Sequence, residues 1–224
     1  MRFAVIGWND GNVGDAIQTI AAKELLERHG HEVVIVKDKK RDDVGAYFVN
    51  GFFGCPLNFP RPTIYASCYI EKTEYIPKGT VIGCRDYATM ERVKEAGSVP
   101  FFTSCLTLSL KRDVSNNGQV LAVDVDVPGV ERRTHLGFSN WEGCFSQAYR
   151  NLETYAACDT IHTNKIHVAL PGVAFGKKVV FNPDGIDRLE RLDGIGHLFT
   201  EREQVPKLKA WWEDFAMRLS NEYK

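Results

Sequence analysis

The chain opens with a short apolar run, Arg2-Phe3-Ala4-Val5-Ile6-Gly7, followed by a polar loop, Trp8-Asn9-Asp10-Gly11-Asn12-Val13-Gly14-Asp15. Residues 16–29 then place apolar side chains at the spacing of one helical face. Gly30 stops this pattern, and residues 31–36 return to a β-rich composition. A strand, a loop, a helix and a second strand in this order predict a βαβ unit with two parallel strands.

The same alternation continues along the rest of the chain. Before a polar, turn-rich stretch at 111–118, we expect strands at 46–49, 63–66 and 80–83 and a helix at 87–96. After that stretch we expect strands at 119–127, 160–162 and 178–181 and helices at 144–157, 165–175 and 206–219. The pattern predicts an α/β fold with two lobes, residues 1–112 and 113–224, each on a mainly parallel sheet, with the last helix packing back.

The composition excludes several classes of protein. Lys and Arg number 28 and Asp and Glu 29, a balance that argues against a nucleic-acid partner. No apolar run approaches the ~20 residues of a membrane span, so we expect no integral membrane segment. The six cysteines include no CxxC pair, so their spacing supports no metal site. The N-terminus lacks the pattern of a secretory signal, and the expected location is the cytoplasm.

The loop after the first strand is the first candidate site. Gly14 would allow close backbone approach, and the helix that follows presents free N–H groups to an anion or a sugar hydroxyl. The loop does not match GxGxxG and lacks the Lys-Ser/Thr of a P-loop, so a dinucleotide or nucleoside triphosphate site is poorly supported. An ordinary capping turn explains the same residues, with Asp10 or Asn12 as the N-cap and Asp15 in the first helical turn.

Two later junctions between a strand and a helix carry cationic side chains. Arg85 is expected at the carboxyl end of a strand, where a guanidinium can clamp a carboxylate or phosphate; a surface ion pair is the alternative. Further along, Thr163 or Asn164 would cap a helix whose opening turn holds Lys165 and His167. Lys165 supplies a positive charge, and His167 can act as an acid or hydrogen-bond donor near neutral pH, although a single histidine is often structural.

Taken in order, these motifs resemble those of the polysaccharide pyruvyl transferase family. The resemblance rests on Asn12-x-Gly14-Asp15, the glycine loop at Gly51, Arg85-Asp86-x-x-Thr89, Cys105-Leu106-Thr107-Leu108, Lys165-x-His167 and Gly176-Lys177-Lys178-Val179-Val180. It implies two Rossmann-like lobes in a compact glycosyltransferase-B-like arrangement, with the active site in the cleft between them. It further implies transfer of a pyruvyl group from phosphoenolpyruvate to a pair of sugar hydroxyls, forming a ketal, without a metal or another cofactor.

The resemblance also implies roles for individual residues. Arg85 matches the arginine that holds the donor, and Lys165 stands where the family usually has arginine. His167 matches a histidine proposed as the general acid, which suits the protonation of an enol carbon. Asn12 and Asp15 match the loop that faces the cleft, with Asp15 the candidate base for the acceptor hydroxyl. The expected substrate-binding set is completed by Gly14, Gly51 and Asn164.

Two other functions fit the same residues. A glycosyltransferase-B-like enzyme that uses a nucleotide sugar could place Lys165 and His167 against the diphosphate. A non-catalytic protein of the same fold could bind a carbohydrate or an anion without turnover. Each of these functions is compatible with a homo-oligomer.

Overall fold

The computed structural model of the chain describes residues 1–7, 11–37, 41–60, 62–135, 140–183 and 192–222. The strands of the first half are β1 (Arg2–Ile6), β2 (Glu32–Val36), β3 (Ala46–Phe53), β4 (Thr63–Ile70), β5 (Val81–Cys84) and β6 (Val99–Phe102). Those of the second half are β7 (Val120–Val123), β8 (Arg132–Arg133), β9 (Thr160–Thr163) and β10 (Lys178–Phe181). The helices are α1 (Val13–Arg28), α2 (Tyr87–Glu95), α3 (Trp141–Ala157), α4 (Ile166–Ala174) and α6 (Val205–Glu222). Short 3₁₀ turns are η1 (Thr73–Tyr75), η2 (Leu106–Ser109), η3 (Gly196–Phe199) and η4 (Arg202–Gln204).

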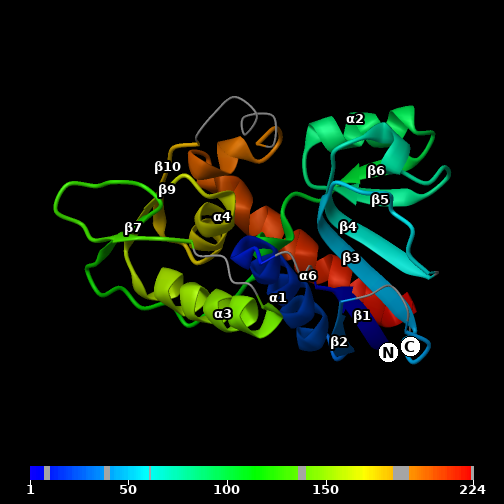
Figure 1. The fold of residues 1–224 in the computed structure, drawn as a ribbon, viewed down its shortest axis with the longest axis horizontal. Helices are drawn as coiled ribbons and strands as arrows, with labels where there is room; N and C mark the ends of the chain where they lie inside the picture. The colour runs from blue at the N-terminus through cyan, green and yellow to red at the C-terminus, as the bar shows by residue number, and fades with distance from the viewer. Residues whose placement is uncertain (8–10, 38–40, 61, 136–139, 184–191, 223–224) are drawn as a thin grey trace.

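The described strands form two sheets, and the strand pairs within each sheet are parallel. The first sheet has the order β2-β1-β3-β4-β5-β6, and the second has the order β10-β9-β7-β8. Figure 1 shows the first sheet on the right and the second on the left, with α1 and α4 between them. The prediction of an α/β fold with parallel sheets is confirmed.

One apolar core joins the two sheets. Helix α1 lies at its centre, because twelve of its sixteen residues are buried. Its Ile17 and Ile20 belong to the same buried cluster as Leu121 of β7 and Ile161 of β9. The segment 110–119 therefore connects two sheets that share their core, and α1 fixes the position of one sheet against the other.

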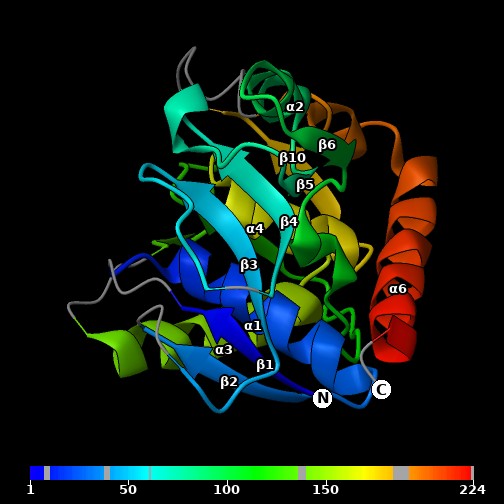
Figure 2. The same ribbon diagram turned by 90° about the vertical axis from the view of Figure 1, so that its right-hand side faces the viewer.

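Helix α6 packs back onto the first half of the chain, as Figure 2 shows along one side of the molecule. Trp212 is fully buried in the shared core. At its polar edge, Glu213 accepts a hydrogen bond from Arg28 at 2.9 Å and lies 2.9 Å from Nε2 of His29. None of the described helices, α6 included, is long and apolar enough to span a bilayer.

Three local expectations are corrected by the structure. Gly51 was expected in a loop but lies inside β3, at φ 111° and at a shift in the register between β3 and β4. Such a bulge requires a backbone conformation that glycine adopts readily. Strand β7 ends at Val123 rather than at 127, because Asp124 turns the chain at φ 56°. Residues 128–135 follow a strand, and their sequence favours a surface loop over a source of further cations for the cleft; they include the short, exposed strand β8.

Candidate functional site

A cavity of about 400 Å³ lies where the carboxyl ends of the two sheets meet. The first half of the chain contributes Asn12, Asp15, Phe52 and Arg85 to its lining. The second half contributes the polar residues His135, Asn164, Lys165 and His167 and the apolar residues Ile166, Phe181 and Leu192. Ligands of parallel sheets bind beyond the carboxyl ends of the strands, so this cavity is the candidate site.

The start of α1 supplies a capped turn to the cavity. Asn12 is the N-cap: its Oδ1 accepts a hydrogen bond from the N–H of Gly14 at 2.9 Å, and its Nδ2 donates to Asp15 Oδ2 at 3.0 Å. Gln18 Nε2 donates to the other oxygen of Asp15 at 3.1 Å. The capping turn is therefore confirmed at Asn12, and the residues that form it also face the cavity; Asp10 lies outside the described residues.

Gly14 does not line the cavity itself but makes room for His167. A Cβ atom at position 14 would lie 2.5 Å from Cδ2 of the His167 ring, much closer than van der Waals contact. Glycine is therefore needed here for close approach between α1 and α4. The expected substrate-binding residue Gly51 lies in β3 and is not part of the lining.

Arg85 follows β5 and is buried, with only 3% of its surface exposed. Its guanidinium lies 4.8 Å from the centre of the Tyr69 ring, and its Nε lies 3.6 Å from Asp86 Oδ2. That separation is too long for a hydrogen bond, and Nε is buried without a hydrogen-bond partner in the described part of the chain. Arg85 therefore pairs with Asp86, as the alternative expected, but the pair is buried rather than on the surface, and the Nε donor of Arg85 is left unused beside a cavity.

Asp86, the residue after Arg85, caps the start of α2 and lies beside the Arg85 guanidinium. Its Oδ1 caps the helix by accepting a hydrogen bond from the N–H of Thr89 at 2.8 Å. Burial raises the pKa of the Asp86 carboxyl, and the charge of Arg85 opposes that rise. The carboxylate faces Arg85 through a long contact that leaves the guanidinium free for a ligand.

Helix α4 begins at the cavity without a side-chain cap. The N-cap residue is Lys165, not Thr163 or Asn164 as expected, and lysine has no acceptor with which to cap. Thr163 Oγ1 instead accepts a hydrogen bond from the N–H of Lys165 at 3.0 Å, and Asn164 Nδ2 donates to the carbonyl of Asp124 at 3.2 Å. The N–H group of Val168 donates to the carbonyl of Lys165 at 3.1 Å, so the N–H groups of Ile166 and His167 are those left for an anion in the described structure.

His167 lies in the first turn of α4, and its ring is electrically neutral at pH 7. Burial, reinforced by the nearby charge of Arg85 and by His135, lowers the pKa of His167 from 6.5 to about 3. Its Nε2 lies 3.5 Å from the amide nitrogen of Gln18. The expected general acid is therefore unprotonated at neutral pH until something in the cavity stabilises its charged form.

His135 is a lining residue from the stretch 128–135, for which the sequence favours a surface loop over a source of cations for the cleft. It ends the basic stretch Arg132-Arg133-Thr134-His135, which resembles a solvated surface loop. Burial and the charge of Lys165 lower the pKa of His135 to about 4, although the Asp124 carboxylate opposes this change. The short strand β8 that precedes it was the missing signal, because it brings His135 to the carboxyl edge of the second sheet.

The charges of the lining favour an anion. Arg85 and Lys165 are positive, Asp15 is negative, and both histidines are neutral at pH 7. The positive ends of the α1 and α4 dipoles add to the cationic side. Phe52 and Phe181 supply apolar walls from opposite sheets. The site is suited to a small anionic molecule with a modest apolar surface.

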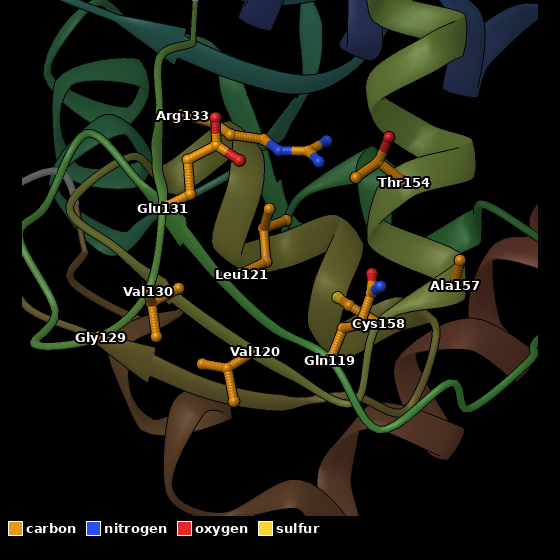
Figure 3. Close-up of a pocket in the computed structure, with 10 residues that line it drawn as sticks. All are labelled: Gln119, Val120, Leu121, Gly129, Val130, Glu131, Arg133, Thr154, Ala157 and Cys158. Atoms are coloured by element: carbon orange, nitrogen blue, oxygen red, sulfur yellow. The ribbon is translucent and has the colours of Figure 1, made fainter.

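A larger hollow of about 610 Å³ lies elsewhere, at the amino end of β7 and the last turn of α3 (Figure 3). Figure 3 shows Arg133 reaching toward Thr154, with Glu131 nearby. Burial raises the pKa of the Cys158 thiol at its edge, so this thiol is not activated. The hollow lies at the wrong end of its sheet for a ligand site, and we assign the candidate site to the other cavity.

The described residues include no group of three or more His, Cys, Asp or Glu side chains that could hold a metal ion. All six cysteines are described and form no disulfide, and five of them are buried. The cavity must therefore be considered for what its own side chains can do.

Comparison with known proteins bears on the fold alone. No family model matches the chain, and no curated protein matches it. Among solved structures, the crystal structure of a functionally uncharacterized protein from Klebsiella pneumoniae matches with a TM-score of 0.57 and 14% sequence identity. The match covers 90% of this chain and 89% of that chain, so the two share an α/β fold over nearly their whole length.

Proposed function

We propose that this chain is a transferase that moves a pyruvyl group from phosphoenolpyruvate to a pair of hydroxyls on a carbohydrate. The observation that carries the proposal is Arg85, a buried cation with an unbonded Nε at the edge of the cavity. A buried donor without a hydrogen bond is costly even where the charge has an ion-pair partner, as Arg85 has in Asp86, and such groups in native proteins commonly mark a ligand site. The resemblance to the polysaccharide pyruvyl transferase family supplies the identity of the ligand and of the reaction.

The donor has two anionic groups, and the cavity offers a suitable partner for each. The planar fork of Arg85 suits the carboxylate, which it can bind through two parallel hydrogen bonds. Lys165 and the uncapped first turn of α4 suit the phosphate. In the glycosyltransferase-B-like arrangement that we propose, these groups lie on opposite walls of one cleft and together offset the desolvation of the donor.

The reaction requires a proton on the methylene carbon of the donor. Protonation there leaves the neighbouring carbon electrophilic, and a sugar hydroxyl attacks it and loses its proton to a base. The second hydroxyl then attacks the same carbon, and inorganic phosphate leaves with the proton of that hydroxyl, which completes the ketal. Asp15 is the candidate base, with both carboxylate oxygens oriented by the side chains of Asn12 and Gln18.

Binding of phosphoenolpyruvate would raise the pKa of His167, the candidate general acid, so that its ring becomes protonated. A unit negative charge about 4 Å from the His167 ring, at an effective dielectric constant near 20, stabilises the imidazolium by about 4 kcal/mol. That energy corresponds to a roughly thousandfold increase in proton affinity. His167, which burial keeps neutral at pH 7, would thus become a usable proton donor only when phosphoenolpyruvate is present.

One alternative is favoured by a specific observation. The neutral state of His167 and the two hydrogen bonds on Asp15 also suit a protein that binds an anion without turning it over. A nucleotide sugar is the other alternative, with its diphosphate against Lys165 and His167. The free cysteines suit a reducing compartment such as the cytoplasm.

Calorimetry and a phosphate-release assay test the proposal together. We expect phosphoenolpyruvate to bind and nucleotide sugars not to bind. We also expect phosphate to be released from phosphoenolpyruvate only when a carbohydrate acceptor from the test panel is present. Binding without release for any acceptor would favour the non-catalytic protein, and binding of nucleotide sugars alone would refute the proposal.

A further inference from the structure

We propose that His135 is a second ligand-contacting imidazole, a neutral ring held in one tautomer by Tyr155 so that its Nε2–H donates a hydrogen bond to the anion in the cavity. The inference rests on the proposed function for the identity of that anion, phosphoenolpyruvate. It concerns a residue to which the family resemblance assigns no role. It follows from the position of the His135 ring, from the Tyr155 hydroxyl beside its Nδ1, and from its Nε2, which has no hydrogen-bond partner among the described residues.

The backbone around Asp124 fixes the position of His135. Asp124 Oδ2 accepts a hydrogen bond from the N–H of His135 at 3.1 Å, and the N–H of Asp124 donates to the carbonyl of Arg133 at 2.8 Å. The Asp124 carbonyl accepts from Asn164 Nδ2 at 3.2 Å. Asp124 has φ 56°, a conformation that persists only where surrounding contacts enforce it. These three bonds fasten His135 beside the start of α4.

Tyr155 determines the tautomer of His135. The Tyr155 side chain is buried, and its hydroxyl lies 3.4 Å from His135 Nδ1, its hydrogen-bond partner in the described part of the chain. Burial raises the pKa of the Tyr155 hydroxyl, so the hydroxyl keeps its proton and needs a hydrogen-bond acceptor for it. Donation to Nδ1 satisfies the buried O–H, whereas the opposite direction would leave it without an acceptor. The ring proton of His135 is therefore on Nε2.

The Nε2–H group of His135 is the unused donor. Nε2 is buried and has no hydrogen-bond partner among the described residues, although the ring lines the cavity. The charged groups that face the ring are Asp124 on one side and Lys165 on the other. Before the anion binds, burial keeps the ring neutral, so His135 adds no charge that would repel the cations of the site.

His167 repeats the same arrangement from α4. The amide nitrogen of Gln18 is a donor and lies 3.5 Å from His167 Nε2, so that nitrogen accepts and the proton lies on Nδ1. His167 Nδ1 is likewise buried without a partner in the described structure. His135 and His167, which both line the cavity, thus each have one ring nitrogen beside a protein donor and one without a hydrogen-bond partner in the described part of the chain. This pairing is what a site needs to hold several anion oxygens at once.

Nuclear magnetic resonance of the ring nitrogens tests the proposal directly. Long-range ¹H–¹⁵N spectra of the full chain should show the His135 proton on Nε2, and addition of phosphoenolpyruvate should shift that resonance. In Tyr155→Phe the ring should populate both tautomers. A ring that carries its proton on Nδ1 in the wild type, or that does not respond to any anion that binds, would overturn the proposal.

Binding measurements provide the second readout. His135→Phe should weaken phosphoenolpyruvate binding by about tenfold, the effect of one hydrogen bond to a charged group. His135→Gln, which keeps an N–H near the Nε2 position, should stay within about threefold of wild type. Equal losses in both variants would contradict a donor role. If His135→Phe does not fold, the glutamine variant and the wild-type spectra still decide the question.

Inorganic phosphate separates this proposal from the proposed function. If phosphoenolpyruvate fails to bind but phosphate binds and shifts the His135 Nε2–H resonance, the proposed function fails and the assignment of His135 holds. If phosphoenolpyruvate binds in an Arg85-dependent manner while the His135 resonance does not move, the proposed function holds and the assignment of His135 fails.

Discussion

Replacement of Arg85 by methionine removes the buried cation while keeping most of the side-chain volume. The guanidinium makes only a 3.6 Å contact with Asp86 and a ring contact with Tyr69, so a bound carboxylate can accept two hydrogen bonds from it. At about 1.5 kcal/mol for each bond to a charged group, the variant should lose about 3 kcal/mol of binding free energy. This corresponds to a roughly 150-fold weaker dissociation constant for phosphoenolpyruvate, measured by calorimetry.

Arg92 provides a matched control for this experiment. It also lies over the Tyr69 ring, at 5.9 Å, but its guanidinium donates to the carbonyl of Ile70 at 3.2 Å and it does not line the cavity. Arg92→Met changes the net charge equally and should leave the dissociation constant within about twofold. Arg85→Lys should bind with intermediate affinity, because it keeps the charge but loses the fork. A similar loss in both methionine variants, or a loss below threefold in Arg85→Met, would refute the assignment.

Lowering the pH from 7.5 to 5 should reduce the free energy of unfolding by about 1–2 kcal/mol for each of His167 and His135, measured by urea titration. The pKa values of His167 and His135 lie at about 3 and about 4 in the folded chain, below the ordinary 6.5. The unfolded chain therefore binds more protons as the pH falls, and the folded chain loses stability. A free energy of unfolding that does not change with pH would contradict these shifts. Gly14→Ala should weaken phosphoenolpyruvate binding at least tenfold by calorimetry, because the new Cβ would lie 2.5 Å from the His167 ring, and unchanged affinity would remove that ring from the site. Trp212→Ala should destabilise the chain by about 3–5 kcal/mol in the same urea titration, because Trp212 is fully buried in the core that both sheets share, and a loss below about 1 kcal/mol would show that α6 is dispensable.

Local pattern was sufficient to predict much of this fold. Apolar alternation and helical periodicity located the main strands and helices, and the parallel α/β class followed from their order. Errors were concentrated at element ends. Helix α1 begins at Val13 because Asn12 caps it, and β3 extends through Gly51 because a bulge absorbs the glycine conformation. Such ends depend on individual hydrogen bonds and register shifts, which periodicity does not encode.

Some residues of the candidate site could also be predicted from local pattern, and others depend on the tertiary structure. Arg85, Lys165 and His167 could be selected in advance, because each lies at a junction where a strand gives way to a helix. For the stretch that contains His135 the sequence favoured a surface loop over the cleft, because its two-residue strand has no sequence pattern of its own and the position of His135 depends on contacts with Asp124 and Tyr155. The burial of Arg85 and the neutral state of His167 were likewise invisible in the sequence, since both depend on what surrounds the charge.

The sequence alone therefore determined which segments would be strands and helices and which junctions would carry charged side chains, because these properties depend on residues close together in the chain. Only the tertiary structure decided that the junctions meet. Helix α1 buries its apolar surface against both sheets at once, and this long-range packing brings Arg85 from the first half of the chain and Lys165 from the second to one cavity.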